Sequence, residues 1–368
     1  MRLEPIHNQT SRLGFPAVHP HAAGQSLDPK NTWTYARREQ ENFSPRTTLR
    51  PRSWPRVALV GSAAALGAAA LYNVLRAREA EREHPPIGEF INVDGVRLHY
   101  IERGTGDPLV LIHGNGTLIQ DFTINGLVDR LAETRRVIVI ERPGYGYSTR
   151  PRWLWTPRAH ATLFEKALRE LGVHNAVVLG HSWGTMVAVA LALQAPNLVR
   201  SLVLLSGYYY PTARLDVALF SPPAIPVIGD AMRYTVSPLI ARSILPGLIK
   251  KMFEPAAVPE HFQRRFPHEL MSRPIQLRAS AEDAALMTPA AMELQEHYRE
   301  LKLPIVIVTG SDDQIVDVGR QSLRLGEELP HSEVIVLPGL GHMVHHLAPT
   351  EIIDAINRAT QRSFNRVV

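Results

Sequence analysis

Apolar residues along this chain recur in short runs, and each run ends in turn residues. Runs of this length and composition are typical of buried parallel strands. The six clearest are PLVLIHG (108–114), RRVIVIERPG (135–144), NAVVLGHS (175–182), VRSLVLLSG (199–207), LPIVIVTG (303–310) and HSEVIVLPG (331–339). Two earlier segments, GEFINVDG and VRLHYIERG, meet at Asp94-Gly95, a pair that predicts a hairpin turn. We therefore expect eight strands.

Helical patterns lie between these runs. They occupy residues near 123–133, then 157–171, 183–194, 317–328 and 349–362. Pro157 is typical of a first helical turn, and Gly172 of a helix end. Strands that alternate with helices predict a mostly parallel sheet flanked by helices on both faces, an α/β fold. Residues 88–207 and 301–368 form this predicted core.

Residues 208–300 interrupt the alternation. This stretch has no strand pattern but contains helical segments such as 237–253 and 279–301. We interpret it as a helical lid over the carboxyl ends of the strands, where open α/β sheets bind ligands.

The chain before residue 88 lacks this alternation of strand and helix patterns. Residues 1–56 are polar, basic and without apolar periodicity, which predicts disorder. Residues 57–75 carry no charge, and as a helix they would span roughly 28 Å, close to a bilayer core of about 30 Å. We predict a transmembrane helix at 57–76, with a buried Ala-rich helix or a signal segment as alternatives. The charged residues 77–87, which end in Pro85-Pro86, read as a linker.

Positive charges are more numerous before the apolar segment than after it. Six Lys/Arg side chains lie within about 20 residues upstream, and three lie close downstream among acidic residues. The positive-inside rule then predicts a single-pass membrane protein with a cytoplasmic N-terminus and the domain from residue 88 onward on the outer side, periplasmic or extracellular.

Composition narrows the function classes. The formal net charge is +5, but no aromatic-interleaved basic motif accompanies it, so nucleic-acid binding is not expected. The chain has no cysteine, which excludes disulfides, thiolate metal sites and a cysteine nucleophile. An ordinary apolar share of 45% in 368 residues fits one large domain with additions.

The strongest chemical motif is Gly180-His181-Ser182-Trp183-Gly184, which joins a predicted strand to a predicted helix. A serine at such a sharp turn is held in a strained backbone geometry with its Oγ exposed above the sheet. Its neighbours two residues away must be small so that strand and helix can approach, and Gly180 and Gly184 meet this need. Ser182 is the predicted nucleophile.

A serine hydroxyl needs a base to take its proton, and the base needs an acid to orient it. Two predicted strands end close to such residues. Ser311-Asp312-Asp313 follows the strand at 303–310, and His342 follows the strand at 331–339. For the acid, Asp313 is preferred and Asp312 is the alternative, with a turn or helix cap as its other role.

Two further histidines, His345 and His346, compete with His342 for the role of base. They would lie one turn further along, at the start of a helix. We expect both to be partly exposed surface residues.

Two more motifs suggest a family. Residues 141–148, ERPGYGYS, resemble a D-R-P-G-x-G-x-S turn, and residues 113–116, HGNG, resemble its H-G loop. Residues 88–207 and 301–368 thus resemble the lid-bearing branch of the α/β-hydrolase superfamily. That resemblance supports the order Ser182, Asp313, His342 for a catalytic triad, since Asp313 falls in the family's G-x-x-D pattern.

The resemblance also implies an oxyanion hole formed by the backbone N–H groups of Asn115 and Trp183. It gives His113 a structural role in holding its loop, and no metal or cofactor is expected. Epoxide hydrolases and haloalkane dehalogenases share the loop and the turn but use an aspartate nucleophile, and Ser182 argues against both activities.

The leading hypothesis is hydrolysis of a carboxylic ester or related acyl bond in a small hydrophobic substrate, with the membrane as partner through residues 57–75. Other reactions on the same triad stay open: C–C bond hydrolysis, lactone opening, thioester hydrolysis, acyl transfer and haloperoxidase-type chemistry. A non-catalytic binding module of the same fold is the alternative from another class.

Overall fold

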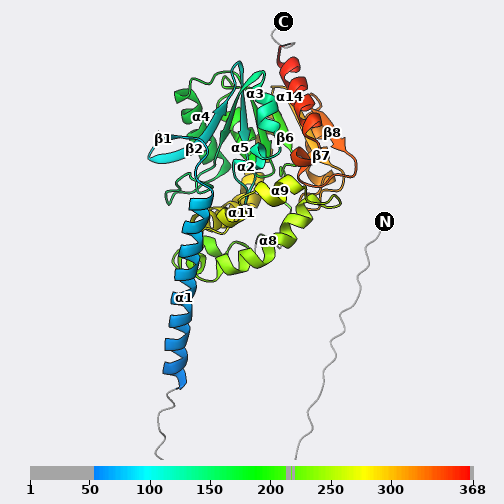
Figure 1. Cartoon of the computed structure of the whole chain (residues 1–368). Coiled ribbons are helices and arrows are strands. Elements are labelled where there is room, and N and C mark those ends of the chain that lie inside the picture. The colour runs from blue at the N-terminus through cyan, green and yellow to red at the C-terminus, as the bar shows by residue number, and fades with distance from the viewer. Residues whose placement is uncertain (1–53, 213–216, 218–219, 365–368) are drawn as a thin grey trace, which may run out of the picture. The chain divides into compact units, whose positions relative to one another are not determined.

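One eight-stranded sheet organises the computed structural model, which describes residues 54–212, 217 and 220–364 (Figure 1). The strand order is β1-β2-β4-β3-β5-β6-β7-β8. β1 and β2 form the antiparallel edge, and the pairs from β4 to β8 are parallel. The bounds are β1 Glu89–Val93, β2 Val96–Arg103, β3 Asp107–Ile112, β4 Arg135–Ile140, β5 Ala176–His181, β6 Val199–Leu205, β7 Ile305–Gly310 and β8 Glu333–Leu337. The predicted α/β fold with a mostly parallel eight-stranded sheet is confirmed.

Helices connect the strands close to the predicted positions. Those of the core are α2 Gln120–Thr123, α3 Leu127–Ala132, α4 Pro157–Glu170, α5 Gly184–Gln194, the π-helix η3 Gly319–Leu323, α12 Arg324–Glu328, α13 Val344–Leu347 and α14 Pro349–Phe364. Both α4 and α14 carry an apolar stripe at helical spacing, which turns toward the sheet.

Alternation along the strands divides the core into two layers. On β5, Val178 packs with α4 and α5, whereas its neighbours Val177 and Leu179 pack with α3 and α14 on the other face. Successive side chains of a strand point to opposite faces, so a strand covered on both sides is apolar throughout. This burial explains why the parallel strands were readable as uninterrupted apolar runs.

The stretch between β6 and β7 contains helices and no strand within its described part, residues 208–212, 217 and 220–300. Its helices are the 3-10 helix η1 Pro222–Ala224, α7 Ile228–Tyr234, α8 Ser237–Phe253, α9 Glu260–Arg265, α10 His268–Met271, α11 Pro274–Leu294 and the 3-10 helix η2 Gln295–Glu300. We call residues 208–300 the helical insertion. Its role as a lid stays a prediction.

The helix before the core, α1, runs over Trp54–Glu83 and is long and apolar enough to cross a membrane. The prediction of a linker beginning at residue 77 is wrong, because the helix continues for two more turns. Residues 76–83 are Arg, Ala and Glu, which favour helix, and Ala80 is buried. The helix ends just before Pro85-Pro86, which cannot continue it. Nearly all of the predicted disordered segment, residues 1–53, lies outside the described chain.

Candidate active site

Ser182 lies at the turn between β5 and α5, with its side chain partly exposed. Its φ angle is 51°, in the left-handed region that costs energy for any residue with a Cβ. A Cβ built on Gly180 would lie 2.6 Å from the carbonyl oxygen of Gly184, and one on Gly184 would lie 2.4 Å from that of Ile112. Close packing therefore demands glycine at both predicted positions, and the strained turn presents Ser182 above the sheet.

The candidate base is paired with one of the two candidate acids. His342 Nδ1 lies 2.8 Å from Oδ2 of Asp313. The other carboxylate oxygen of Asp313 accepts hydrogen bonds of 2.8 and 2.9 Å from two backbone N–H groups of the following turn. Asp312 is exposed and accepts a hydrogen bond from the hydroxyl of Ser311 instead. The structure thus brings Asp313, and not Asp312, to His342.

The environment of Asp313 keeps it ionised. Burial raises the pKa of its carboxyl, but the interaction with His342 and the backbone hydrogen bonds outweigh burial and lower the pKa below its usual value. An ionised carboxylate at Nδ1 holds the ring proton there and leaves Nε2 of His342 as a proton acceptor. His181, which precedes Ser182, has its ring centroid 5.1 Å from that of His342. The base therefore lies beside the nucleophile turn.

The loop after β3 passes next to the nucleophile. A Cβ built on Gly114 would lie 3.0 Å from the Cβ of Ser182. Within the described chain, the backbone N–H groups of Asn115 and Trp183 donate no hydrogen bond to another protein group. The side chain of Asn115 is fixed by a 2.6 Å hydrogen bond that its amide oxygen accepts from the Tyr145 hydroxyl. Both predicted oxyanion donors can thus donate to a bound group.

Arg142 orients this loop from behind. Its buried guanidinium donates to the carbonyl oxygens of His113 (3.1 Å) and Gly114 (2.8 Å). In a trans peptide the C=O and the next N–H point in opposite directions. Because the Gly114 carbonyl faces Arg142, the N–H of Asn115 faces away from it. Arg142 is therefore a positioning residue for the candidate oxyanion hole.

The contacts of His113 fit the structural role predicted for it. Its Nε2 accepts a 3.0 Å hydrogen bond from the backbone N–H of Arg142, and its Nδ1 lies 2.9 Å from the Gly114 carbonyl oxygen. Burial, followed by the charge of Arg142, lowers the pKa of His113 to about 3. The ring is therefore neutral and serves to fix the loop.

Asp283 of α11 completes the support and was not found from the sequence. Its carboxylate is fully buried and pairs with Arg142 and, at 2.9 Å, with Arg150. Its backbone carbonyl accepts a 3.1 Å hydrogen bond from the indole N–H of Trp183. Burial raises the pKa of Asp283, but the two arginines outweigh it and lower the pKa to about 2. One carboxylate of the insertion thus pairs with two buried guanidinium groups beneath the oxyanion loop, and Glu282 supplies the second negative charge to Arg150 at 2.7 Å.

We expect Asp283→Asn to lower the free energy of unfolding by about 3–5 kcal/mol, because it leaves the buried guanidinium of Arg142 without a counter-charge, while Arg150 keeps Glu282 at 2.7 Å. Urea unfolding of the full chain in mild detergent measures this. The matched control is Glu293→Gln, which removes an exposed acid of the same helix from Arg158 and should cost at most about 1 kcal/mol.

The difference in stability between wild type and Asp283→Asn should also depend on pH. The contribution of Asp283 is fully present above its ordinary pKa of 3.8 and is lost as the pH falls toward the folded value of about 2. The stability gap between wild type and Asp283→Asn should therefore narrow over that interval. Equal losses in the Asp283 and Glu293 variants would contradict the proposed ion-pair network.

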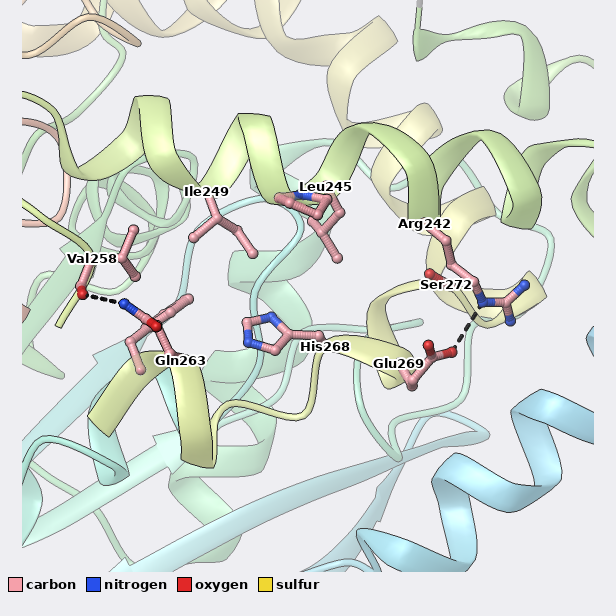
Figure 2. Close-up of a pocket in the computed structure, with 10 residues that line it drawn as sticks. Arg242, Leu245, Ile249, Val258, Gln263, His268, Glu269 and Ser272 are labelled. Atoms are coloured by element: carbon pink, nitrogen blue, oxygen red, sulfur yellow. Dashed lines mark hydrogen bonds and ion pairs between the residues drawn. The ribbon is translucent and has the colours of Figure 1, made fainter. Parts of the chain in front are cut away.

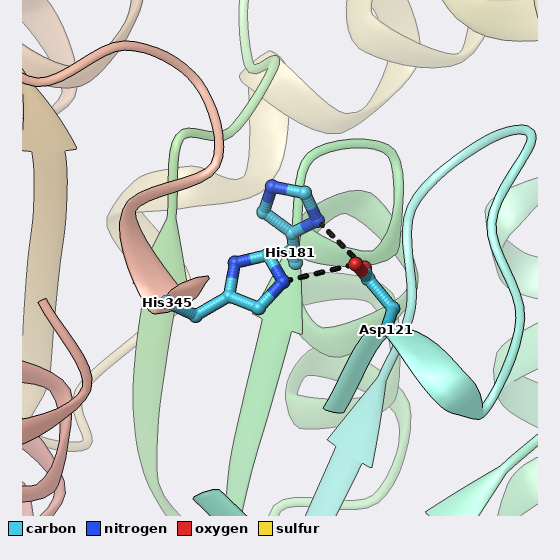
Figure 3. A group of neighbouring side chains, drawn as sticks. All are labelled: Asp121, His181 and His345. Carbon is cyan, nitrogen blue, oxygen red and sulfur yellow. Dashed lines mark ion pairs between the residues drawn. The ribbon is translucent and has the colours of Figure 1, made fainter. Parts of the chain in front are cut away.

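A second buried group lies below the nucleophile turn (Figure 3). The carboxylate of Asp121 on α2 lies 3.4 Å from Nδ1 of His181, 3.1 Å from Nε2 of His345 and 3.0 Å from Nε2 of His346. The prediction that His345 and His346 are partly exposed surface residues is wrong, since their exposed fractions are 0% and 5%. The short helix α13 points them inward because the Asp121 carboxylate attracts both rings.

Electrostatics keep Asp121 ionised in this group. Burial raises its pKa, but the interactions with the three histidines outweigh burial and lower the pKa well below the usual value. Burial lowers the pKa values of His181 and His345, the latter to about 3. Asp121, His181 and His345 offer ligand atoms within 4.8 Å of one another and could hold a metal ion, a possibility that the sequence did not suggest.

Two cavities lie in the described chain near these elements. The smaller, about 340 Å³, is bordered by Asp313 and Tyr208 and lies at the ends of β6 and β7. The larger, about 420 Å³, lies inside the helical insertion, between α8 and the short helices α9 and α10 (Figure 2). Its apolar wall includes Leu245, Ile249 and Phe262. No triad candidate lines the larger cavity, so we assign it no step of the chemistry.

The chain resembles known proteins over most of its length. A family model described as the alpha/beta hydrolase fold matches residues 107–349. The 2-hydroxymuconate semialdehyde hydrolase of Pseudomonas sp. (strain CF600) is 29% identical over 287 residues, which cover 73% of this chain and 93% of that enzyme. Haloalkane dehalogenase 2 of Mycobacterium tuberculosis is 25% identical over 273 residues, covering 71% and 90%. These two relatives carry different hydrolytic activities.

Solved structures show the same architecture. An esterase from Exiguobacterium antarcticum aligns with a TM-score of 0.61 at 20% identity, covering 74% of this chain and 100% of that one. At this level of identity the likeness concerns the fold alone.

Proposed function

The chain belongs to the alpha/beta hydrolase fold family, and on this premise we propose that it is a serine hydrolase that cleaves a carboxylic ester or related acyl bond. The observation that carries the proposal is the His342–Asp313 pair beside a serine held in left-handed backbone geometry. Labelling of Ser182 by a fluorophosphonate probe tests the proposal, as do the ester-hydrolysis kinetics of Ser182→Ala and Asp313→Asn.

The proposed reaction uses these groups in turn. Oγ of Ser182 attacks the acyl carbon while Nε2 of His342 takes its proton, and Asp313 stabilises the imidazolium. The N–H groups of Asn115 and Trp183 stabilise the negative charge that develops on the acyl oxygen. His342 then gives its proton to the leaving group, which departs and leaves an acyl-enzyme. Water, activated by His342, hydrolyses that ester and restores the Ser182 hydroxyl.

Hydrolysis of a C–C bond is the second candidate on the same groups. It is favoured by the 29% identity with a 2-hydroxymuconate semialdehyde hydrolase across 93% of that enzyme. The two candidates separate by substrate. Faster turnover of simple esters than of 2-hydroxymuconate semialdehyde supports ester hydrolysis. The reverse order supports C–C bond hydrolysis.

We further propose that the substrate is hydrophobic. The helical insertion is rich in apolar side chains: several are exposed on α7 and α8, and others, such as Leu245 and Ile249, line its cavity, which no triad candidate borders. We expect the catalytic efficiency on p-nitrophenyl esters to rise from acetate to octanoate, by about 10-fold or more, because each buried methylene contributes about 0.8 kcal/mol. A profile that peaks at acetate would contradict a hydrophobic acyl site and leave the triad chemistry untouched.

We also propose that α1 anchors the protein in a membrane as a single span, with its N-terminus in the cytoplasm and the catalytic domain on the outer side. Residues 57–75 carry no charge, and the side chains of Val57, Leu59, Val60 and Leu71 are exposed. Exposed apolar side chains of this size along a helix of this length suit a hydrocarbon environment. The excess of arginines upstream supports the orientation.

A further inference from the structure

One polar residue of α1 ties this helix to the insertion. Asn73 is fully buried, and its side-chain amide donates to the backbone carbonyl oxygens of Tyr234 (3.0 Å) and Thr235 (2.7 Å). Its amide oxygen accepts a 2.8 Å hydrogen bond from Arg242. These bonds fix the end of α7 and the first turns of α8 at the level of residue 73 of α1.

That level coincides with the end of the apolar segment. The first charged residue after residue 57 is Arg76, which pairs with Glu79 and, at 3.3 Å, with Glu269 of α10. From Val57, the first residue after Arg56, to Asn73 the helix rises about 24 Å, most of the thickness of a bilayer core of about 30 Å. A membrane that surrounds α1 would therefore end where α7 and α8 begin.

The surface of the insertion at this level is apolar. Figure 1 shows α8 crossing the side of the body from which α1 extends. The exposed large apolar side chains of this segment are Ile225, Val227, Ile228, Tyr234, Val236, Leu239, Ile240, Ile244 and Leu248. We call these residues the α7–α8 apolar face. Patches of this kind on a soluble surface mark an interaction site.

The helix α8 is apolar on two sides, one turned outward and one turned toward the cavity. Ile240, Ile244 and Leu248 follow one another at intervals of four and share the outer side, with exposed fractions of 50%, 38% and 39%. Leu245 and Ile249 lie on the inner side and line the cavity shown in Figure 2. Packing inside the insertion explains the apolar residues on the inner side of α8. Within the described chain, no protein neighbour buries the apolar residues on its outer side.

The charged side chains of this segment do not prevent its contact with an apolar phase. Residues 225–248 contain three charged side chains, Asp230, Arg233 and Arg242. Asp230 pairs with Arg233 at 2.9 Å and with Arg152 of the core at 2.7 Å. Arg242 pairs with Glu269 at 3.0 Å. Each charge on the segment is therefore neutralised by a neighbour.

We propose that the α7–α8 apolar face lies on the lipid bilayer, at the boundary between hydrocarbon and headgroups, beside the point where α1 enters it. This inference rests on the proposed membrane span of α1. Lipid is the expected occupant because Asn73 fixes the face at the depth where the uncharged part of α1 ends. α8 then forms the wall between the bilayer and the cavity of the insertion.

Absence of cysteine from the chain makes a direct test possible. Three single-cysteine variants of the full chain carry an environment-sensitive NBD fluorophore: Ile244→Cys on the outer side of α8, Leu66→Cys in the middle of α1, and Glu351→Cys on α14. In Figure 1, α14 lies at the far end of the body from α8. Each is reconstituted into phosphatidylcholine vesicles without a quencher, or with lipids whose acyl chains bear a quenching spin label at one of two depths, near the headgroup for position 244 or near the chain end for position 66.

We expect blue-shifted emission and loss of fluorescence in spin-labelled vesicles at positions 244 and 66, with neither at position 351. Quenching at 66 with a water-like, unquenched signal at 244 overturns the inference and leaves the span intact. A blue-shifted but unquenched signal at 244 also overturns it, because a second protein copy then covers the face. Absence of quenching at position 66 would contradict the membrane span of α1, and with it the proposed contact of the α7–α8 apolar face with lipid.

Discussion

Replacing Ser182 with alanine is expected to lower kcat for ester hydrolysis by about 10⁴-fold or more. The reason is that the variant lacks the Oγ that forms the covalent intermediate, so only the oxyanion donors and binding contacts remain. Alanine is smaller than serine and keeps the packing of the turn. Steady-state kinetics on a p-nitrophenyl ester, with circular dichroism as the check on folding, measure this effect.

The control for this variant is Ser363→Ala near the end of α14. The hydroxyl of Ser363 donates a hydrogen bond to the backbone carbonyl oxygen of Thr360. It should keep kcat within about two-fold, as a surface substitution far from the site does. A folded Ser182→Ala protein with more than a tenth of wild-type kcat would show that another group attacks the substrate. The binding-module alternative predicts that wild type itself shows no ester turnover.

The second large effect is expected for Asp313→Asn, with a loss of kcat of about 10⁴-fold. An asparagine amide at this place can donate to Nδ1 of His342, which moves the ring proton to Nε2. That tautomer cannot accept the proton of Ser182. The geometry barely changes, so folding and substrate affinity should change little while kcat collapses.

Asp312→Asn is the matched control, because it makes the same chemical change one residue away. The exposed Asp312 carboxylate bonds to Ser311 and has no contact with His342. We expect kcat within about three-fold of wild type, in line with an exposed site. If the two variants lost activity equally, or if only Asp312→Asn did, the pairing of Asp313 with His342 would not be the catalytic one.

The fold was predictable because its strands are buried on both faces. Residues 176–181, for instance, are apolar or glycine up to the final histidine, and their neighbours on the sheet have the same character. Such runs, separated by helical patterns, allow few arrangements. The helix–linker boundary at residue 77 was misread because Arg, Glu and Ala favour both a solvated helix and a charged linker. Only the burial of Ala80 in a cluster with insertion residues such as Leu270 decides between them.

The candidate site was predictable where local sequence and strand order suffice. Ser182, Asp313 and His342 follow three strands that are parallel, so their proximity follows from the topology. Asp283 could not be found in this way. It lies on α11 among Ala and Glu residues, and only the packing of the insertion against the core brings it to Arg142.

The histidines next to the base illustrate the same limit. From sequence, His345 and His346 look like polar residues at a helix start, the usual setting of exposed side chains. The partner that draws them inward is Asp121, more than 200 positions earlier in the chain. A buried polar side chain is predictable only when its partner is known.

The site of covalent modification by a fluorophosphonate probe tests most directly whether Ser182 is the nucleophile. The full chain is treated in mild detergent, its mass is measured intact, and the modified peptide is sequenced by tandem mass spectrometry. We expect one adduct per chain, on Ser182, absent after heat unfolding and formed much more slowly in Asp313→Asn. An adduct on a different serine, or a folded wild-type protein that acquires none, would contradict it.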